Sequence, residues 1–159
     1  MATGQLITPS LGPTRTEADF VAHIDRTIAT DPDGEWVFVV DQLNTHKSEA
    51  LVRLVNKQCG LNIDLGVKER SGILKSMKTR AAFLSDPTHG IHFVYTPKHA
   101  SWLNQIEIWF SILVRRVLTR GNFTSAADLQ ARILDFIYYF NRTMAKPVKW
   151  TYSGCPLTV

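Results

Sequence analysis

The amino-acid sequence predicts a fold of the α/β class, and two observations support that prediction. Two short runs of β-forming apolar residues, Trp36–Val40 and Ile91–Tyr95, are typical of strands buried on both faces of a mostly parallel sheet. Segments with apolar residues at helical spacing stand before, between and after these runs. The 159 residues, 45% hydrophobic and 20% charged, are enough for one globular domain whose core needs no disulfide. We therefore expect a single domain over residues 1–159.

Turn and capping signals predict the first elements. Residues 5–8 predict a short strand, which Pro9 ends. A helix is expected next, because Thr16 and Asp19 have the spacing of a capping box and the apolar residues after them recur at helical spacing: Phe20, Val21, Ile24 and Ile28. The Asp-Pro-Asp-Gly sequence at residues 31–34 predicts the turn that precedes the first apolar run.

A basic segment separates the two apolar runs. A helix is expected over residues 48–57, and Gly60 is placed to end it. Within the following 66–80, five basic residues stand against one acidic residue, Glu69; the basic residues are Lys68, Arg70, Lys75, Lys78 and Arg80. Ser71 is a candidate cap for a helix whose inward residues would be Ile73, Leu74, Met77, Ala81 and Leu84. We interpret residues of about 60–90 as a basic helical insertion.

Two helices are expected after the second run, which Thr96 and Pro97 close. Ser101 can cap the first helix, whose apolar residues form one stripe: Leu103, Ile106, Phe110, Leu113 and Val117. Gly121 is placed to end this helix. The second helix begins at about Ser125, where Asp128 completes a capping-box pattern, and it buries Leu129, Ile133, Phe136, Ile137 and Phe140.

Several classes of site are excluded by the motifs that the sequence lacks. It has no phosphate-binding P-loop, no G-x-G-x-x-G, no G-x-S-x-G and no H-E-x-x-H, so no nucleotide cofactor is expected. Cys59 and Cys155 lie far apart and form no C-x-x-C pair, which favours a reduced cytoplasmic setting without structural zinc. No run is apolar enough to span a membrane, and Met1 opens no secretory leader.

Charge is distributed unevenly along the chain. Residues 1–40 hold two basic and six acidic residues, a net charge of −4, whereas residues 41–159 hold sixteen basic and eight acidic residues, a net charge of +8. A positive field favours a polyanionic partner such as nucleic acid. Arg115, Arg116, Arg120 and Lys98, together with the basic insertion, are candidate phosphate contacts. The alternative is a solvated helix face whose arginines offset the helix dipole.

The role of three tryptophans also has two interpretations. Trp102, Trp109 and Trp150 can stack on bases. Aromatic residues beside Ile106 and Phe110 are more often part of a core.

Two acidic residues are the candidates for chemistry. Asp41 directly follows the first apolar run, and ligands of open α/β sheets bind at the carboxyl ends of strands. Its alternative role is that of a turn former or helix cap. Glu107 lies about 40° around its helix from Leu103, at the edge of the apolar stripe, with Asn104 one turn earlier. The alternative to a functional role for Glu107 is that of a solvated residue at the border of the stripe. If the two carboxylates converge, they form a hard-oxygen site suited to Mg²⁺ or Mn²⁺.

The residues around these acids carry a family resemblance. Residues 41–47 are Asp-Gln-Leu-Asn-Thr-His-Lys, and residues 101–110 are Ser-Trp-Leu-Asn-Gln-Ile-Glu-Ile-Trp-Phe. Together with Arg120-Gly121 and Phe140-Asn141-Arg142, they resemble bacterial insertion-sequence transposases of the mariner-type superfamily, specifically the six-thirty family. The resemblance extends from about residue 36 to residue 152, and the 101–110 block is its most specific part.

The resemblance implies an RNase H-like fold, the DDE transposase/integrase catalytic core. In that family three carboxylates bind two Mg²⁺ or Mn²⁺ ions and cut and join DNA at the element ends and the target. Asp41 then corresponds to the second acid and Glu107 to the third, with supporting roles for Asn44, His46 and Asn104. The implied setting is the bacterial cytoplasm, with association to the nucleoid when bound to DNA.

Two departures from the family pattern modify this expectation. None of the 40 residues before Asp41 fits the first acid, so we expect a catalytic core that is incomplete at its N-terminus and impaired in cleavage. The 65 residues between Asp41 and Glu107 exceed the usual interval, and the basic insertion accounts for the excess. The alternative function is a non-catalytic DNA-binding or subunit-interaction fragment of a transposase. A homodimer is a separate expectation for the partners of the chain.

Overall fold

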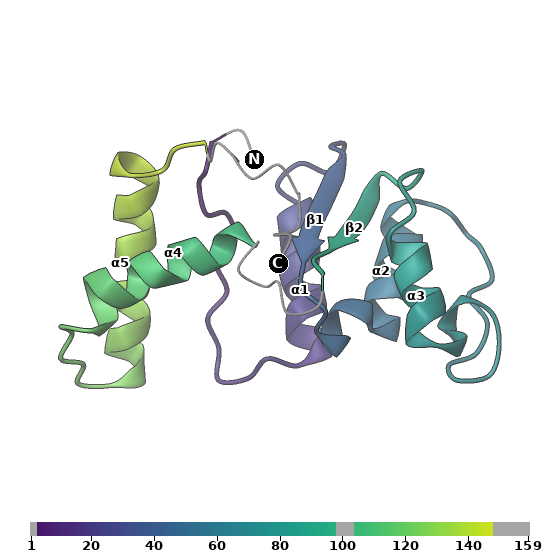
Figure 1. The fold of residues 1–159 in the computed structure, drawn as a ribbon, viewed down its shortest axis with the longest axis horizontal. Coiled ribbons are helices and arrows are strands. Elements are labelled where there is room, and N and C mark those ends of the chain that lie inside the picture. The colour runs from purple at the N-terminus through teal and green to yellow at the C-terminus, as the bar shows by residue number, and fades with distance from the viewer. Residues whose placement is uncertain (1–2, 98–103, 148–159) are drawn as a thin grey trace, which may run out of the picture.

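The fold is that of a computed structural model, which describes residues 3–97 and 104–147. Helices and strands alternate along most of the chain, as the α/β prediction requires (Figure 1). The elements are α1 (Glu17–Ile28), β1 (Trp36–Val40), the 3₁₀ turn η1 (Asn44–Lys47), α2 (Glu49–Gln58), the 3₁₀ turn η2 (Ile73–Lys75), α3 (Met77–Leu84), β2 (Ile91–Tyr95), α4 (Gln105–Leu113), the π-helical turn η4 (Val114–Leu118) and α5 (Ala126–Thr143).

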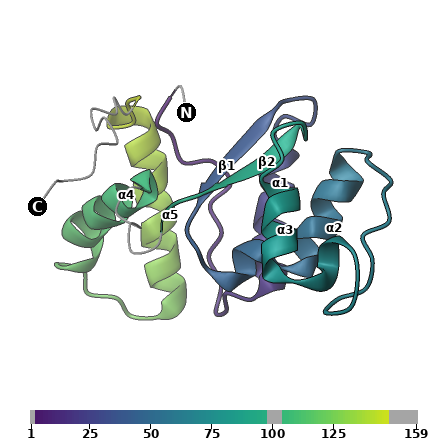
Figure 2. The same ribbon diagram turned by 45° about the vertical axis from the view of Figure 1, so that its right-hand side comes forward.

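The two predicted strands pair in parallel. Trp36 lies opposite Ile91 and Val40 opposite Tyr95, and α2 and α3 form the crossover between them. Helices α1, α2 and α3 pack on one face of this sheet (Figures 1 and 2). The core on that face contains Ile24, Ile28, Val40, Leu51, Val52, Val55, Leu65, Leu74, Phe83, Leu84, Ile91 and Phe93. The parallel pairing places the carboxyl ends of both strands at the same edge of the sheet.

The opposite face of the sheet is not buried by the described residues, so the prediction of strands buried on both faces is wrong for this part of the chain. Val37, Val39 and Val94 are 55%, 44% and 48% exposed. The reason is that α4 and α5 pack against each other and form a second core, which contains Trp109, Leu113, Ile137 and Phe140. Trp109 is therefore a core residue, whereas Trp102 and Trp150 lie outside the described residues.

The expected strand at residues 5–8 does not form, and this segment instead connects the two cores. The amide side chain of Asn141 on α5 accepts from the Leu6 N–H at 2.9 Å and donates to the Leu6 carbonyl at 2.8 Å. Two residues later, the Thr8 hydroxyl lies 2.7 Å from that of Thr27 on α1. A side-chain amide satisfies the backbone groups that a neighbouring strand would otherwise pair, so no sheet is needed here.

The capping signals locate the starts of three helices. Thr16 and Asp19 form the predicted capping box of α1, and the Ser48 hydroxyl accepts from Leu51 N at the start of α2. Ser125 caps α5 as expected, but the carboxylate of Asp128 reaches past it and accepts from Thr124 N at 3.0 Å.

The insertion helix begins later than the sequence predicts. Ser76, not Ser71, caps α3, because Gly72 has a φ of 65° and residues 73–75 form the turn η2. Met77 is consequently 44% exposed rather than inward. Ser101 lies outside the described residues, and Asn104 caps α4. No helix in the described part of the chain is both long and apolar enough to cross a membrane.

Candidate active site at the carboxyl end of the sheet

Asp41 lies at the carboxyl end of β1, immediately after the buried Val40. Its carboxylate is held by its own loop: Oδ1 accepts from Leu43 N at 2.9 Å and lies 2.9 Å from Nδ1 of His46. The Asp41 side chain nevertheless remains 43% exposed. Position at a strand end, fixed orientation and access to solvent are the three properties that a ligand-binding carboxylate requires.

The loop that carries His46 is fastened to the end of β2. Gln42 Nε2 donates to the Thr96 carbonyl at 2.6 Å, and Lys47 Nζ donates to Gln42 Oε1 at 2.6 Å. The Tyr95 hydroxyl donates to the His46 carbonyl at 2.8 Å, and Lys47 Nζ lies 4.8 Å from the centre of the Tyr95 ring. Burial raises the pKa of Tyr95 well above its ordinary value, so this donor keeps its proton. The network joins the ends of both strands around Asp41.

Sequence reasoning overlooked Gln42, Lys47 and Tyr95 as parts of this site. Gln42 and Lys47 belong to the polar sequence that follows the first strand, and Tyr95 ends the second strand. Polar side chains at the carboxyl ends of two neighbouring parallel strands are a signal that would have indicated all three.

The three predicted supporting residues differ in their placement. His46 is 14% exposed, and its ring centre lies 4.3 Å from that of Phe20 on α1, so the ring that contacts Asp41 is fixed by packing. Asn44 is exposed in η1 and has no hydrogen bond to Asp41 among the described residues. Asn104 acts as the N-cap of α4, where its side chain accepts from Ile106 N.

Glu107 lies in the first turn of α4, where its negative charge is favourable toward the helix dipole. It is exposed, its N–H donates to the Asn104 carbonyl, and within 3–97 and 104–147 no side chain or N–H donates to its carboxylate. The amino-terminal end of α4 is the end nearer the sheet in Figures 1 and 2. Seven residue steps separate Pro97 from Asn104, so the chain between them spans at most about 25 Å.

The structure does not bring Asp41 and Glu107 into contact. No hydrogen bond or ion pair joins them in the described part of the chain, which also contains no group of three or more His, Cys, Asp or Glu that could hold a metal ion. Their carboxylates do match Mg²⁺ or Mn²⁺ in kind, since these ions prefer charged oxygen ligands. The donors therefore fit a hard divalent cation chemically, with two carboxylates from two elements.

The predicted DNA contacts of the insertion divide into exposed and buried residues. Lys68 and Arg70 stand in the loop between Gly66 and Gly72, and Lys75 and Lys78 follow it; all four are exposed. The loop folds back on itself, since Ser71 N donates to the Val67 carbonyl and Val67 N donates to the Ser71 hydroxyl.

Arg80 is a correction to the predicted set. It is 8% exposed, and its guanidinium donates to the carbonyls of Lys47 and Leu74 at 2.8 and 3.1 Å. A guanidinium that is buried in the core and hydrogen-bonded to these carbonyls is not available to contact DNA. Lys98 lies outside the described residues. Arg115 and Arg116 in η4 and Arg120 in the turn after it are exposed.

One family model matches the chain. The model of the DDE superfamily endonuclease family matches residues 2–130, a range that includes Asp41, the insertion and Glu107. The chain belongs to this family. No curated protein and no solved structure matches it. As a DDE superfamily endonuclease domain, the chain has DNA as its substrate and a nuclease function of the transposase type, in a superfamily that generally uses divalent metal ions.

Proposed function

We propose that this DDE endonuclease domain holds Mg²⁺ or Mn²⁺ with Asp41 and Glu107 and cuts DNA strands at that site. The observation that supports the proposal most is the presentation of Asp41. Its carboxylate is 43% exposed at the carboxyl end of β1 and is oriented by His46 and by the N–H of Leu43. A carboxylate with a purely structural role in a turn would not need a packed histidine and a network that ties its loop to β2.

The chain's own residues have separate tasks in this mechanism. When bound, the divalent ion activates a water or a 3′-hydroxyl and stabilises the leaving oxygen of the phosphodiester. Asp41 and Glu107 supply the negative oxygens that hold it. His46 keeps Oδ1 of Asp41 in place, which fixes the orientation of the carboxylate. Gln42 and Tyr95 fix the loop, which limits the movement of Asp41 during the reaction.

The finer assignment is a transposase of the mariner-type superfamily, in the six-thirty family of insertion sequences. The sequences at 41–47 and 101–110 support it, and in that pattern Asp41 is the second acid and Glu107 the third. The first acid has no counterpart among the residues that precede Asp41 in this sequence. Two carboxylates hold a metal more weakly than three, so we expect the cleavage activity of these 159 residues by themselves to be impaired.

A second candidate function is non-catalytic binding to DNA or to another subunit, a second copy included. It is favoured by the lack of a three-residue metal cluster in the described residues, together with the exposed basic residues of the insertion. This candidate predicts salt-dependent DNA binding that needs neither metal nor Glu107.

The experiment that tests the proposal measures Mn²⁺ binding by titration calorimetry and Mn²⁺-dependent nicking of supercoiled plasmid. Asp41→Asn and Glu107→Gln remove one carboxylate charge each. Asp33→Asn is the matched control, because Asp33 is exposed in the turn before β1 and loses the same charge. We expect each site variant to weaken Mn²⁺ binding about tenfold or more and to abolish residual nicking, while the control behaves like the wild type. Equal Mn²⁺ affinity and nicking in all four proteins would refute the assignment.

A further inference from the structure

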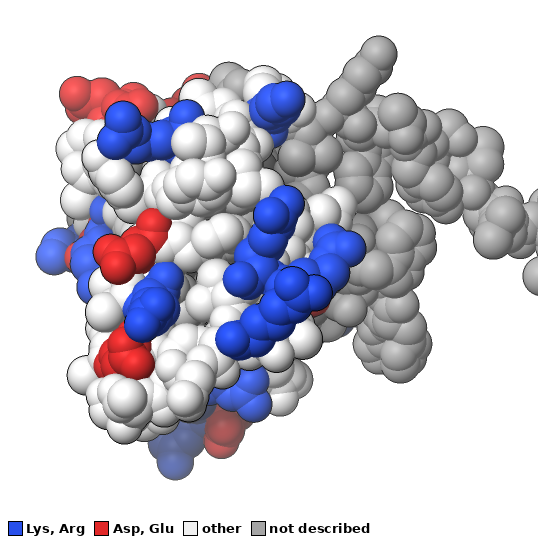
Figure 3. Space-filling model, turned by 90° about the vertical axis from the view of Figure 1, so that its left-hand side faces the viewer, with Lys and Arg blue, Asp and Glu red and all other residues white. Residues whose placement is uncertain are grey.

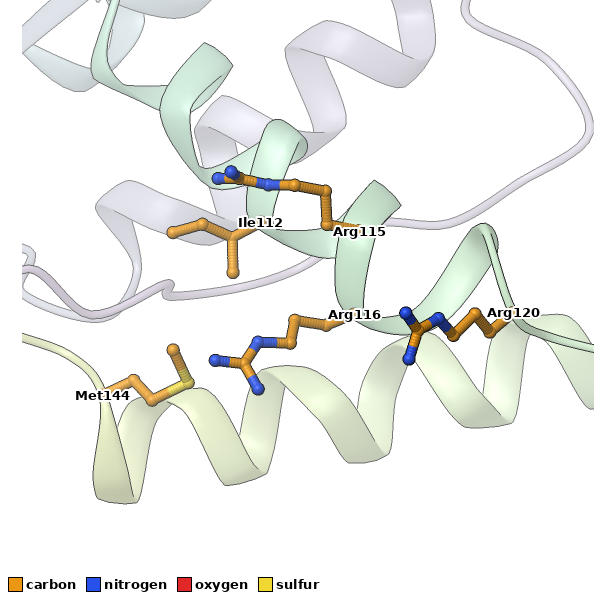
Figure 4. Close-up of a pocket in the computed structure, with 5 residues that line it drawn as sticks. All are labelled: Ile112, Arg115, Arg116, Arg120 and Met144. Carbon is orange, nitrogen blue, oxygen red and sulfur yellow. The ribbon is translucent and has the colours of Figure 1, made fainter.

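Three arginines gather at a groove on the side of the molecule formed by α4, η4 and α5. The groove has a volume of about 370 Å³ and is lined by Ile112, Arg115, Arg116, Arg120 and Met144. Figure 4 shows the Arg116 side chain extending toward Met144, with Arg120 on the same side and Arg115 extending past Ile112 on the side away from α5. Figure 3 shows Lys and Arg side chains gathered over this face.

The charges of these arginines are not neutralised by any carboxylate in the described part of the chain. Within residues 3–97 and 104–147, no Asp or Glu forms an ion pair with Arg115, Arg116 or Arg120. Arg132 on α5 differs, because it pairs with Asp128 on its own helix. Three guanidinium groups beside one groove repel one another, and an anion between them removes that repulsion.

The π-helical turn narrows the spread of these arginines around the helix axis. In a regular α-helix, residues five apart lie about 140° apart around the axis, so Arg115 and Arg120 would point to different sides. The π turn adds one residue to the turn, which reduces that separation to about 40°. The Thr119 N–H donates to the Val114 carbonyl at 2.9 Å, which is the i to i+5 bond of such a turn. By the same count, Arg116 lies about 60° from Arg120 on its other side, so the three arginines fall within about 100° around the axis.

Two apolar side chains, those of Ile112 and Met144, complete the lining of the groove. The helix dipole explains Arg115 in part, since its Nε donates to the Ser111 carbonyl at 3.2 Å, but it does not require Arg116 and Arg120 to line the same groove.

We propose that this groove is a binding site for a phosphate group, and that its ligand is a backbone phosphate of DNA held at a distance from the carboxylates of the active site. Guanidinium groups offer paired N–H donors that match phosphate oxygens. The proposal extends the proposed function and rests on it, because the proposed function is the reason for naming DNA as the ligand. It assigns binding of the duplex backbone to η4 and the turn after it, while the strand ends of β1 and β2 serve the chemistry.

The test is fluorescence anisotropy of a labelled duplex with the full chain, in EDTA, over a series of salt concentrations. EDTA removes the contribution of any metal at Asp41 and Glu107, so a difference between an arginine variant and the wild type reports on the replaced arginine. The variants are Arg115→Gln, Arg116→Gln, Arg120→Gln and the triple replacement. Arg132→Gln is the matched control, since Arg132 is an exposed arginine on the neighbouring helix that already has a carboxylate partner.

We expect each single variant to weaken duplex binding roughly three- to tenfold at low salt. The slope of log K against log salt should become shallower by about 0.9 for each phosphate that the variant no longer neutralises. Arg132→Gln should change neither quantity. Arg116→Lys keeps the charge but loses the paired donors, so a loss of affinity in this variant supports a built site rather than a diffuse positive field.

Two results would overturn the proposal. One is a triple variant whose affinity and salt slope equal those of the wild type while its circular dichroism spectrum is unchanged. The other is a groove that binds inorganic pyrophosphate, with loss of that binding in the triple variant, although duplex binding is unaffected; the ligand would then be a free phosphate compound and not DNA. In either case intact Mn²⁺ binding by Asp41 and Glu107 would leave the proposed function standing.

Discussion

Replacing Arg80 by methionine tests whether this arginine is part of the core or part of a DNA-binding surface. Its guanidinium donates to the carbonyl of Lys47, the last residue of η1, and to the carbonyl of Leu74 in η2. Arg80 thereby ties the insertion to the loop that carries His46. Methionine fills much of the same volume but donates no hydrogen bond.

The magnitude follows from the two hydrogen bonds. A hydrogen bond to a charged group contributes about 1.5–3 kcal/mol, and both carbonyls lose a donor in a largely buried place. Relief of the cost of burying a charge offsets part of this loss. We therefore expect Arg80→Met to lower the free energy of unfolding by about 3 kcal/mol, which lowers Tm by roughly 6–12 °C for a chain of this length.

The assay is urea unfolding followed by circular dichroism, with Lys78→Met as the matched control. Lys78 lies on the same helix but is exposed, so its replacement should change the unfolding free energy by no more than about 0.5 kcal/mol. Well below its Tm, Arg80→Met should bind duplex DNA as the wild type does, whereas Lys78→Met should bind it more weakly. Wild-type stability combined with reduced DNA affinity in Arg80→Met would refute the reasoning.

Three further predictions follow from the described geometry. Gly66→Ala should destabilise the chain by at least about 2 kcal/mol more than Gly60→Ala in urea unfolding. Both glycines have positive φ, but a Cβ at Gly66 would lie 2.3 Å from the Ser71 carbonyl oxygen, whereas nothing lies within 4 Å of a Cβ at Gly60. Equal losses of stability in the two variants would contradict the loop geometry. Ser48→Ala should cost about 1 kcal/mol in the same assay, because the buried Ser48 hydroxyl caps α2, and an unchanged midpoint would show that the cap contributes nothing. Burial, and secondarily the positive charge of Arg26, lower the pKa of His23 below its ordinary value of 6.5. The unfolded chain therefore binds this proton more readily, and stability should fall as pH decreases below about 6.5; His23→Gln should flatten that fall between pH 7.5 and 5.5, and a steeper fall in the variant would reverse the sign argued here.

The sequence alone determined most of the local elements and the DDE family, but not the absence of a strand at residues 5–8 or the start of α3 at Ser76. Both strands, the caps at Thr16, Ser48 and Ser125 and the parallel α/β arrangement were predicted correctly, because β-forming runs, helical spacing and capping side chains act over a few neighbouring residues. The residues around Asp41 and Glu107 indicated the DDE pattern for a related reason: each motif consists of consecutive residues, so it can be recognised without knowledge of the fold.

The tertiary structure decided which faces are covered and which charges are available. One face of the sheet is open in the described residues because α4 and α5 pack on each other. Arg80 is buried because carbonyls from two distant turns meet it, while Arg115 and Arg120 share a groove because a π turn rotates one toward the other. Each of these outcomes depends on which distant segments meet or on how one turn is wound, and residue type and spacing along the chain carry no information about either.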